Sequence, residues 1–327
     1  MLRASRYLGF AGVIALGLFA CTQDVVGPAR SVSRSTAAIT AAANPAIAFA
    51  IQTGKPYKFT YSLGVMNADG SNQTSLVPSG PAPHAAWSPD GHSIAYDPDI
   101  FRISRIDISV VNGKPQASAP VALPISHQAF DIAWSPDPLN DQIAYSWSSP
   151  VVGDPGGLTL APSHPVTPYV ETEIYRTPPN QHVVWIAWNP QATRIAFIQR
   201  CGTSVAVDSL FILDMTISPA PTATFIRQFQ RGVFGLSWSR TQPDRLALAY
   251  PTTATKSGFQ PAFLDLTTNT LSNSPAGLGA NWSPDDSRLA YYSTSNSGVS
   301  TVSVVTLSSG ATVNLASGVN PEWRRNP

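Results

Sequence analysis

A short motif recurs along this chain of 327 residues and restricts the possible folds more than any other feature. In each copy an apolar segment ends in tryptophan, a polar turn follows, and a second apolar segment begins. The fullest copy is A-A-W-S-P-D-G-H-S-I-A-Y at residues 85–96, and a shortened one, P-E-W-R-R, lies at 321–325. Because such a unit cannot bury its apolar face alone, the repetition indicates similar units packed against one another. The other copies begin at Ile132, Ile186, Leu236 and Ala280.

The residues between the two apolar segments are typical of a tight turn. In Ser-Pro-Asp-Gly, proline sets φ for the first central position, aspartate bonds to its own backbone, and glycine accepts positive φ without a steric penalty. We therefore interpret Asp90, Asp137 and Asp285 as turn residues rather than as catalytic acids or metal ligands.

The spacing of the motif predicts the number of units. Counting from each Ile-Ala-aromatic segment, or its equivalent, to the next tryptophan gives six complete units, and further apolar segments bring each unit to four expected strands. Four strands in about 40 to 50 residues is typical of a propeller blade. The sequence therefore predicts an all-β fold, a six-bladed β-propeller of four-stranded antiparallel blades. The units span residues 47–87, 94–134, 143–188, 195–238, 248–282 and 289–323.

The units begin in the middle of a repeat, which predicts how the ring closes. The strand around Ile47 has no tryptophan strand before it, and the strand around Trp323 has no second strand after it. We expect the C-terminal strand to pair with the N-terminal one, because ring closure removes the free edges that separate sheets would expose.

Composition restricts the classes of partner and of chemistry. Only 12% of the residues are charged and the formal net charge is +1, so we expect no nucleic-acid partner. The Gly-x-Ser-x-Gly, His-Glu-x-x-His and Walker A patterns are absent, and no local motif for a nucleophile, zinc or phosphate is recognisable. Cys201 follows an apolar strand and is expected to be a buried, unpaired thiol.

The N-terminus has the features of an export signal. In residues 1–20 two arginines precede an uncharged run that is too short to span a membrane comfortably. Leu18 and Ala20, which precede Cys21, resemble a bacterial lipobox, which implies cleavage before Cys21 and lipidation of its thiol. Cleavage without a lipid is the alternative, because Phe19 is bulky for that position.

The segment after Cys21 predicts a connection between the membrane and the repeats. Residues 21–44 are rich in Ala, Ser, Thr and Val without a periodic apolar face, so we expect a flexible tether that leads to a propeller domain at 45–327. Thr22 in place of aspartate favours the outer membrane, by resemblance to proteobacterial lipoproteins. We therefore expect an exported protein of the bacterial cell envelope, an outer-membrane lipoprotein facing the periplasm or the cell surface and held in the membrane by its lipid alone.

The repeat resembles a known family. V-M-N-A-D-G-S-N-Q, followed by W-S-P-D-G-H-S-I-A-Y, is similar to the repeat of the TolB C-terminal propeller, a WD40-like six-bladed module of the bacterial periplasm. The resemblance covers roughly residues 45–327 and implies the fold. By analogy with TolB, whose propeller binds a peptidoglycan-associated lipoprotein, it implies an envelope protein or peptide as partner. We expect only the tether, and not the α/β domain of TolB, before the repeats.

The innermost strand of each blade predicts where a ligand could bind. Side chains alternate between the two faces of a strand. Residues two and four before each tryptophan are apolar and should pack between blades, whereas those one and three before it are small or polar and should point into a central channel. The candidates for binding a ligand there are His84, Asp131, Trp185, Asn281, Asn320 and Glu322.

These candidates suit several ligands. A cation, a small polar molecule, an inserted peptide or water alone would each fit such a channel. His84 with Asp131 or Glu322 would suit Zn²⁺, and carboxylates with amide oxygens would suit Ca²⁺, so a divalent cation is the one possible cofactor. Trp185 would either plug the channel or stack against a ligand.

The sequence favours a binding protein over an enzyme. Its first prediction is a monomeric, non-catalytic scaffold that binds a protein or peptide at the cell envelope, with no catalytic residue assigned. The alternative is a metal-dependent hydrolase, similar to six-bladed lactonases, with Glu322 or His84 as the base. The third possibility is a structural component of the envelope.

Overall fold

Short alternating and apolar segments form strands throughout the part of the protein that a computed structural model describes, which is residues 45–99, 101–149, 151, 153–201, 207–217, 220–230, 232–251 and 259–325. This part contains 24 strands and no helix, and therefore no helix able to cross a membrane. The chain divides into two units, Met1–Thr40 and Ala41–Pro327. The predicted signal, Cys21 and the tether lie outside the described residues.

Three of the five sheets have four antiparallel strands in sequence order, as predicted for the blades. A fourth sheet has five strands, because the third strand of its series pairs with two short ones. The four-stranded sheets are β9 (Gln128–Trp134), β10 (Gln142–Ser148), β11 (Gly156–Pro162) and β12 (Thr172–Arg176); β13 (Gln181–Trp188), β14 (Arg194–Cys201), β15 (Val207–Asp214) and β16 (Thr222–Gln230); and β17 (Phe234–Trp238), β18 (Arg245–Pro251), β19 (Phe259–Asp265) and β20 (Thr270–Asn273). The five-stranded sheet contains β4 (Ala85–Trp87), β5 (Ser93–Asp99), β6 (Arg102–Val111), β7 (Lys114–Ala117) and β8 (Val121–Leu123).

The fifth sheet has seven strands and joins the two ends of the described chain. Its long strand β24 (Thr312–Trp323) pairs through its first half with β23 (Ser300–Thr306) and through its second half with β1 (Ile47–Lys55). Ile47 lies opposite Trp323 in this register. None of the five sheets closes on itself within the described residues. The remaining strands are β2 (Lys58–Met66), β3 (Thr74–Ser79), β21 (Leu278–Trp282) and β22 (Arg288–Thr294).

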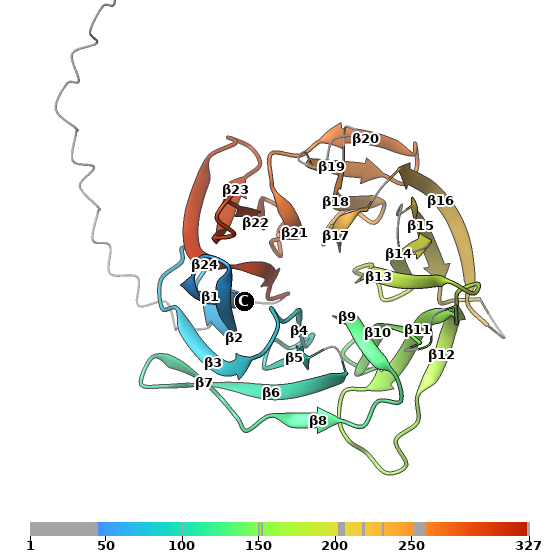
Figure 1. Cartoon of the computed structure of the whole chain (residues 1–327), viewed down its shortest axis with the longest axis horizontal. Helices are drawn as coiled ribbons and strands as arrows, with labels where there is room; N and C mark the ends of the chain where they lie inside the picture. The colour runs from blue at the N-terminus through green and yellow to red at the C-terminus, as the bar shows by residue number, and fades with distance from the viewer. Residues whose placement is uncertain are drawn as a thin grey trace, which may run out of the picture. The chain divides into compact units, whose positions relative to one another are not determined.

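The sheets of the second unit follow one another around a common centre, as Figure 1 shows, with β4, β9, β13, β17 and β21 towards the middle. These strands contact one another in order, and the series continues from β21 to β24 and from β24 to β4. Each begins a sheet and ends in the repeated tryptophan. The described part is therefore an all-β propeller, which confirms the predicted fold class at this level.

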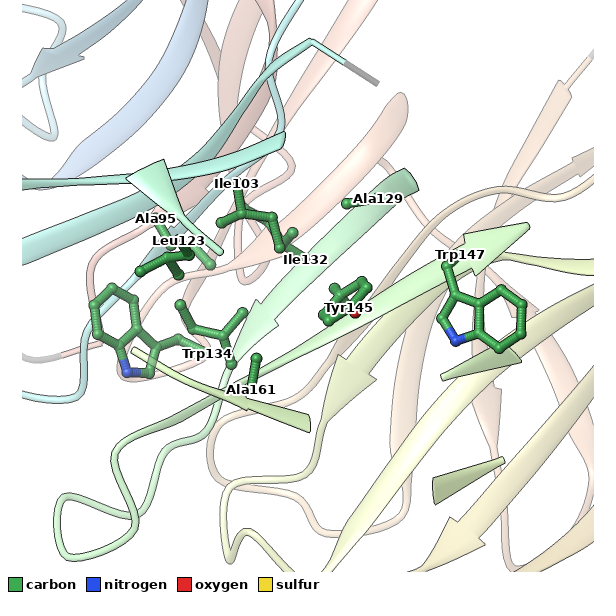
Figure 2. Packing of buried hydrophobic residues seen from close by; sticks show 11 residues of the cluster. Ala95, Ile103, Leu123, Ala129, Ile132, Trp134, Tyr145, Trp147 and Ala161 are labelled. Atoms are coloured by element: carbon green, nitrogen blue, oxygen red, sulfur yellow. The ribbon is translucent and has the colours of Figure 1, made fainter. Parts of the chain in front are cut away.

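The core lies between neighbouring sheets rather than inside any one of them. In Figure 2, Ala95 and Ile103 of one sheet face Ile132, Trp134 and Tyr145 of the next. The second strand of each sheet is covered on both faces, which explains why its Ile-Ala-aromatic segment is continuously apolar rather than alternating. The six repeated tryptophans, each at most 4% exposed, are core residues.

Two kinds of contact recur between neighbouring sheets. Some tryptophan indoles donate to the backbone carbonyl of the residue before the preceding tryptophan: Trp188 Nε1 to Ala133 at 3.2 Å and Trp282 Nε1 to Ser237 at 3.3 Å. An arginine guanidinium also stacks over the next tryptophan, as Arg245 does over Trp282 at 5.2 Å. The repeats are thus joined by polar contacts as well as by the apolar core.

The turns confirm one prediction, and a cysteine corrects another. Asp90, Asp137 and Asp285 each accept a hydrogen bond from the backbone N–H two residues later, at 2.9 to 3.1 Å. They are turn residues, as the sequence indicates. Cys201 was expected to be buried, but it is exposed, because the apolar run ends at Ile198 and the end of β14 leaves the core.

Candidate functional site

Two small cavities lie where the innermost strands meet. The first, about 80 Å³, is called the His84 cavity here and is surrounded by the residues three before each tryptophan: His84, Asp131, Trp185, Gly235, Gly279 and Asn320. The second, about 50 Å³, is called the Arg240 cavity and is surrounded by the residues one before each tryptophan, Ala86, Ala133, Ala187, Ser237, Asn281 and Glu322, and by Arg240 and Arg325. Asn281 and Glu322 border both, so all six candidates line the channel.

The innermost strands are not regular where they border the His84 cavity. On β13, β17, β21 and β24 an extra residue interrupts the pairing with the neighbouring strand. Gly235 and Gly279 take positive φ there, at 67° and 58°, and Asn320 does so at 52°. A Cβ on Gly235 would lie 2.7 Å from the Gly279 Cα. These positions require small residues for the backbone of the bulge as well as for space.

The other face of the innermost strands also borders the cavities. Ile132 and Ile186 lie in the core between sheets, as predicted for residues two before the tryptophan. Both also border the two cavities, together with Ala85 and Leu236. Strict alternation, which assigned these residues to the core alone, is therefore too simple here.

His84 forms an ion pair that the sequence did not indicate. Its Nδ1 lies 3.0 Å from the Asp97 Oδ2, and its side chain is 25% exposed. Burial lowers the pKa of His84, but the charge of Asp97, a hydrogen bond to it and the charge of Asp131 together raise that pKa to about 9. His84 is therefore a cation at neutral pH and is poorly suited to act as a base.

Asp131 lies in the wall of the same cavity and is almost fully buried. Its Oδ2 accepts a hydrogen bond from the backbone N–H of Ile186 at 2.8 Å, across to the next sheet. Burial raises the pKa of Asp131 to about 7, although His84 and this hydrogen bond oppose the shift. The carboxyl group thus changes its charge near neutral pH.

Trp185 and Asn320 are both held by the protein at the edge of the His84 cavity. The Trp185 Nε1 donates to the carbonyl of Val233 at 2.8 Å, and its ring meets the His84 ring edge to face, with 5.5 Å between centroids. The Asn320 Nδ2 donates to the carbonyl of Pro83 at 3.3 Å. Trp185 is half-buried and borders the cavity without filling it.

Glu322 connects the two cavities. Its Oε1 lies 3.3 Å from the Arg240 Nη2, and its Oε2 accepts a short hydrogen bond from the Asn281 side chain. The Asn281 Oδ1 accepts a hydrogen bond from the backbone N–H of Trp323 at 2.9 Å. Burial raises the pKa of Glu322, and the charges of Arg240 and Arg325 oppose this shift. Its carboxylate is therefore the counter-ion of Arg240 in the cavity wall.

Sequence reasoning missed three charged residues that line these cavities or pair with a residue that does. Asp97 lies on β5, directly after the Ile-Ala-Tyr segment, where nothing in the pattern marks it. Arg240 and Arg325 did leave a signal, because each stands two residues after its tryptophan, where the other four copies have proline. A departure from the repeat at those two turns could have indicated a role other than turn formation.

The channel residues do not gather as metal ligands. Within the described part of the chain, no group of three His, Cys, Asp or Glu side chains is placed to hold a metal ion. The polar groups bond instead to the backbone and to each other, as His84 does with Asp97. The divalent cation expected in the channel stays a prediction for metal analysis.

A larger cavity of about 400 Å³ lies away from the channel. Its wall includes Trp147, which His127 overlies with 4.1 Å between ring centroids and against which the Arg176 guanidinium lies at 5.5 Å. Polar residues complete the lining, among them Ser149 and Asp154. This cavity has the size of a small-molecule site, whereas the channel cavities do not.

The comparisons with known proteins concern the fold. No protein-family model matches the chain, and no curated protein matches it in sequence. Its structure is similar to that of TolB from Acinetobacter baumannii, with 16% identity and a TM-score of 0.58 over 85% of this chain and 66% of that one. The chain also matches an oligogalacturonate lyase in complex with manganese, with 11% identity and a TM-score of 0.47 over 84% of this chain and 74% of that one. It matches the β-propeller domain of Cps50 from Myceliophteria thermophila with 10% identity and a TM-score of 0.45 over 83% of this chain and 98% of that one.

The likeness to TolB shows an architecture and not an activity, because the identity is low and the chain spans just under two thirds of that TolB. It agrees with the order of the strands, the inter-sheet core and the innermost strands that end in tryptophan. The described part of this chain is a β-propeller similar to the one in TolB.

Proposed function

We propose that the protein is a six-bladed propeller, closed by its C-terminal strand, that acts as a monomeric, non-catalytic scaffold for a protein or peptide at the bacterial cell envelope. The divided pairing of β24 supports the closure. Residues 312–317 pair with β23 and residues 318–323 with β1, so the seven-stranded sheet divides into two four-stranded blades that share one strand. The five-stranded sheet and the three four-stranded sheets are the other four blades.

The contacts that link successive sheets also support the ring, because they continue across the junction of the chain ends. Trp87 Nε1 donates to the backbone carbonyl of Glu322 at 3.2 Å, which repeats the bond from Trp188 to Ala133. The Arg324 guanidinium lies 5.9 Å from the Trp87 ring, as other arginines do over the next tryptophan. Two unrelated chemical contacts thus follow one cyclic order.

The small volume of the His84 cavity and the polar and aromatic side chains around it are the main support for a binding role. About 80 Å³ is far below the ~300 Å³ at which small-molecule pockets begin. It holds a few waters or the end of one side chain. Around it lie a histidine cation, the half-buried Trp185 and Asn320. A peptide would bind by inserting one side chain into the His84 cavity. The rigid ring around the cavity would provide the rest of the contact surface.

Site-specific crosslinking tests this role. A photoreactive amino acid placed at position 84 in the full chain should crosslink an envelope protein in intact cells, and Trp185→Leu should lower the yield severalfold. The control is the same amino acid at position 139, where Leu139 is 95% exposed. Equal products at both positions, or none at position 84, would contradict the proposal, and the latter result would favour a purely structural component of the envelope.

The alternative function is hydrolysis, and one observation favours it. Asp131, with a pKa of about 7, has the protonation behaviour that a general acid or base needs near neutral pH. The residues first predicted as the base fit less well, because His84 is paired with Asp97 and Glu322 with Arg240. Metal-dependent turnover of lactones that is lost on Asp131→Asn would establish this alternative.

The location at the cell envelope rests on residues outside those that the structure describes. The export signal at 1–20 and Cys21 support it, and the likeness to a TolB propeller agrees with it. On this proposal the lipid holds the protein at the outer membrane, and the tether at 21–44 separates the propeller from the bilayer.

A further inference from the structure

Two of the six repeats lack the turn-forming proline, and both have arginine in its place. Arg240 and Arg325 stand two residues after Trp238 and Trp323. Proline at this position fixes the backbone of the turn but offers no hydrogen-bond donor. Both arginines line the same Arg240 cavity, although they are 85 residues apart in sequence. The other repeats keep the turn-former, as Pro89, Pro136, Pro190 and Pro284.

The Arg240 cavity contains more positive than negative charge. Glu322 is the only carboxylate that lines it among the described residues, against two guanidinium groups. Arg240 is 10% exposed in its side chain, and its Nη2 pairs with Glu322 at 3.3 Å. Arg325 forms no ion pair with any residue that the structure describes. The cavity wall therefore has an excess of one positive charge.

A hydrogen-bond donor in this wall is also unused. The Arg240 Nε is buried and has no hydrogen-bond partner. The second oxygen of Glu322 is already engaged by Asn281, so it does not serve the remaining donors. A buried donor without a partner is costly, and a buried charge without a counter-ion more so, so the described residues leave part of this polar group unpaired.

The electrostatics agree with this geometry. Burial lowers the pKa of Arg325 well below its usual value, the charge of Arg240 lowers it further, and Glu322 opposes the shift only in part. Because a guanidinium keeps its proton in proteins, the cost of this environment is relieved by an anion rather than by deprotonation.

We propose that the Arg240 cavity binds a carboxylate group, held by the guanidinium of Arg325 next to that of Arg240. The planar fork of a guanidinium matches the two oxygens of a carboxylate. A volume of about 50 Å³ suits a group of three heavy atoms better than a larger tetrahedral anion. This site adjoins the His84 cavity through Glu322 and Asn281, but its arginines follow the innermost strands whereas His84 precedes one.

Titration calorimetry of the full chain with sodium acetate, against sodium chloride at equal ionic strength, tests the proposal. We expect acetate to bind with one site per chain, and Arg325→Gln to weaken it at least tenfold. Glu322→Gln should instead tighten acetate binding severalfold, because a competing negative charge is removed. Arg102→Gln is the matched control, since Arg102 is 64% exposed on β6, and it should leave the affinity unchanged.

Further arms identify the source of the carboxylate. If a tripeptide binds with a free C-terminal carboxylate but not as its C-terminal amide, the site recognises the end of a peptide chain. If acetate binds and the tripeptide does not, the site recognises small free acids. The proposal is overturned if acetate and chloride give the same heats, if Glu322→Gln does not tighten binding, or if inorganic phosphate binds more tightly than acetate. A thermal melt of each variant confirms that it is folded.

Discussion

The closure of the ring makes the sharpest prediction, because a few residues at the end of the chain should contribute much of its stability. We consider two changes, Trp323→Ala and deletion of residues 319–327. Trp323 is 2% exposed and packs with Ile47, Phe49 and Met66 from the other end of the chain. On the proposed ring, the deletion removes the innermost strand of a blade, and the substitution removes the tryptophan that packs this strand against the other end of the chain.

The expected magnitude follows from the contacts of Trp323. Its indole N–H has no hydrogen-bond partner, so truncation loses packing without losing a hydrogen bond. Removing a buried tryptophan side chain costs about 3–5 kcal/mol. The Arg288 guanidinium, 4.9 Å from the ring, adds about 0.5–1 kcal/mol. We expect Trp323→Ala to lower the free energy of unfolding by about 4 kcal/mol.

The deletion should cost more than the substitution. It also removes the buried Val319 and the pairing of β1 with the second half of β24, which leaves β1 as an open edge. We expect a loss of at least about 6 kcal/mol, which is comparable to the whole stability of about 5–15 kcal/mol of a typical protein. The truncated chain should be largely unfolded or aggregated at 37 °C.

Urea unfolding followed by circular dichroism measures both effects. The control is Val313→Ala in the first half of the same strand, where the side chain is 57% exposed and the change should lie within about 0.5 kcal/mol. If the deleted chain unfolded at the same urea concentration as the full chain, the C-terminal strand would not be part of the ring. A loss of less than about 1 kcal/mol for Trp323→Ala would refute the packing argument.

Three further predictions concern the channel and the N-terminus. The pKa of His84 is about 9 in the folded protein and 6.5 in the unfolded chain, so its contribution to folding stability is complete below pH 6.5 and is lost as pH rises through 9. The pKa of Asp131 is about 7 in the folded protein and 3.8 in the unfolded chain, so its contribution to stability is lost between pH 4 and 7. Thermal melts should therefore show a falling Tm from pH 6.5 to 9.5, and His84→Gln should flatten that slope; a Tm that rises over this range would contradict the ion pair. Gly235→Ala should destabilise by about 2 kcal/mol, and Gly310→Ala, which has a similar φ of 68° but nothing within 4 Å, by about 1 kcal/mol or less; equal losses in urea unfolding would show that the close approach to Gly279 does not matter. Cys21→Ser should abolish incorporation of labelled palmitate, and labelling that persists would place the lipid elsewhere or nowhere.

Much of the fold follows from local sequence patterns. The turn in each repeat is formed by residues next to one another, as Asp90 and Asp285 show, and needs no distant contact. The tryptophan and the Ile-Ala-aromatic strand recur at fixed places because each blade faces the same surroundings. The face of the innermost strand that borders the channel could also be predicted, because it depends only on the period of a strand.

The candidate site was less predictable, because its contacts join different repeats. Arg240 meets Glu322, 82 residues later, and Asn281 meets Glu322, 41 residues later. The period of a strand shows that a side chain points inwards but does not show which residue it meets there. Asp97 was missed for this reason, and Arg240 and Arg325 were missed because their position in the repeat belonged to a turn.

The repeated strand–turn–strand unit, the all-β propeller class and the small or polar residues that line the cavities can be predicted from the sequence, because they depend on neighbouring residues and on periodicity. The folded chain alone reveals the bulges at Gly235 and Gly279, the exposure of Cys201, the pairing of His84 with Asp97, and the two arginines in the same cavity as Glu322. These features depend on how closely different repeats approach one another, which the sequence of one repeat does not specify.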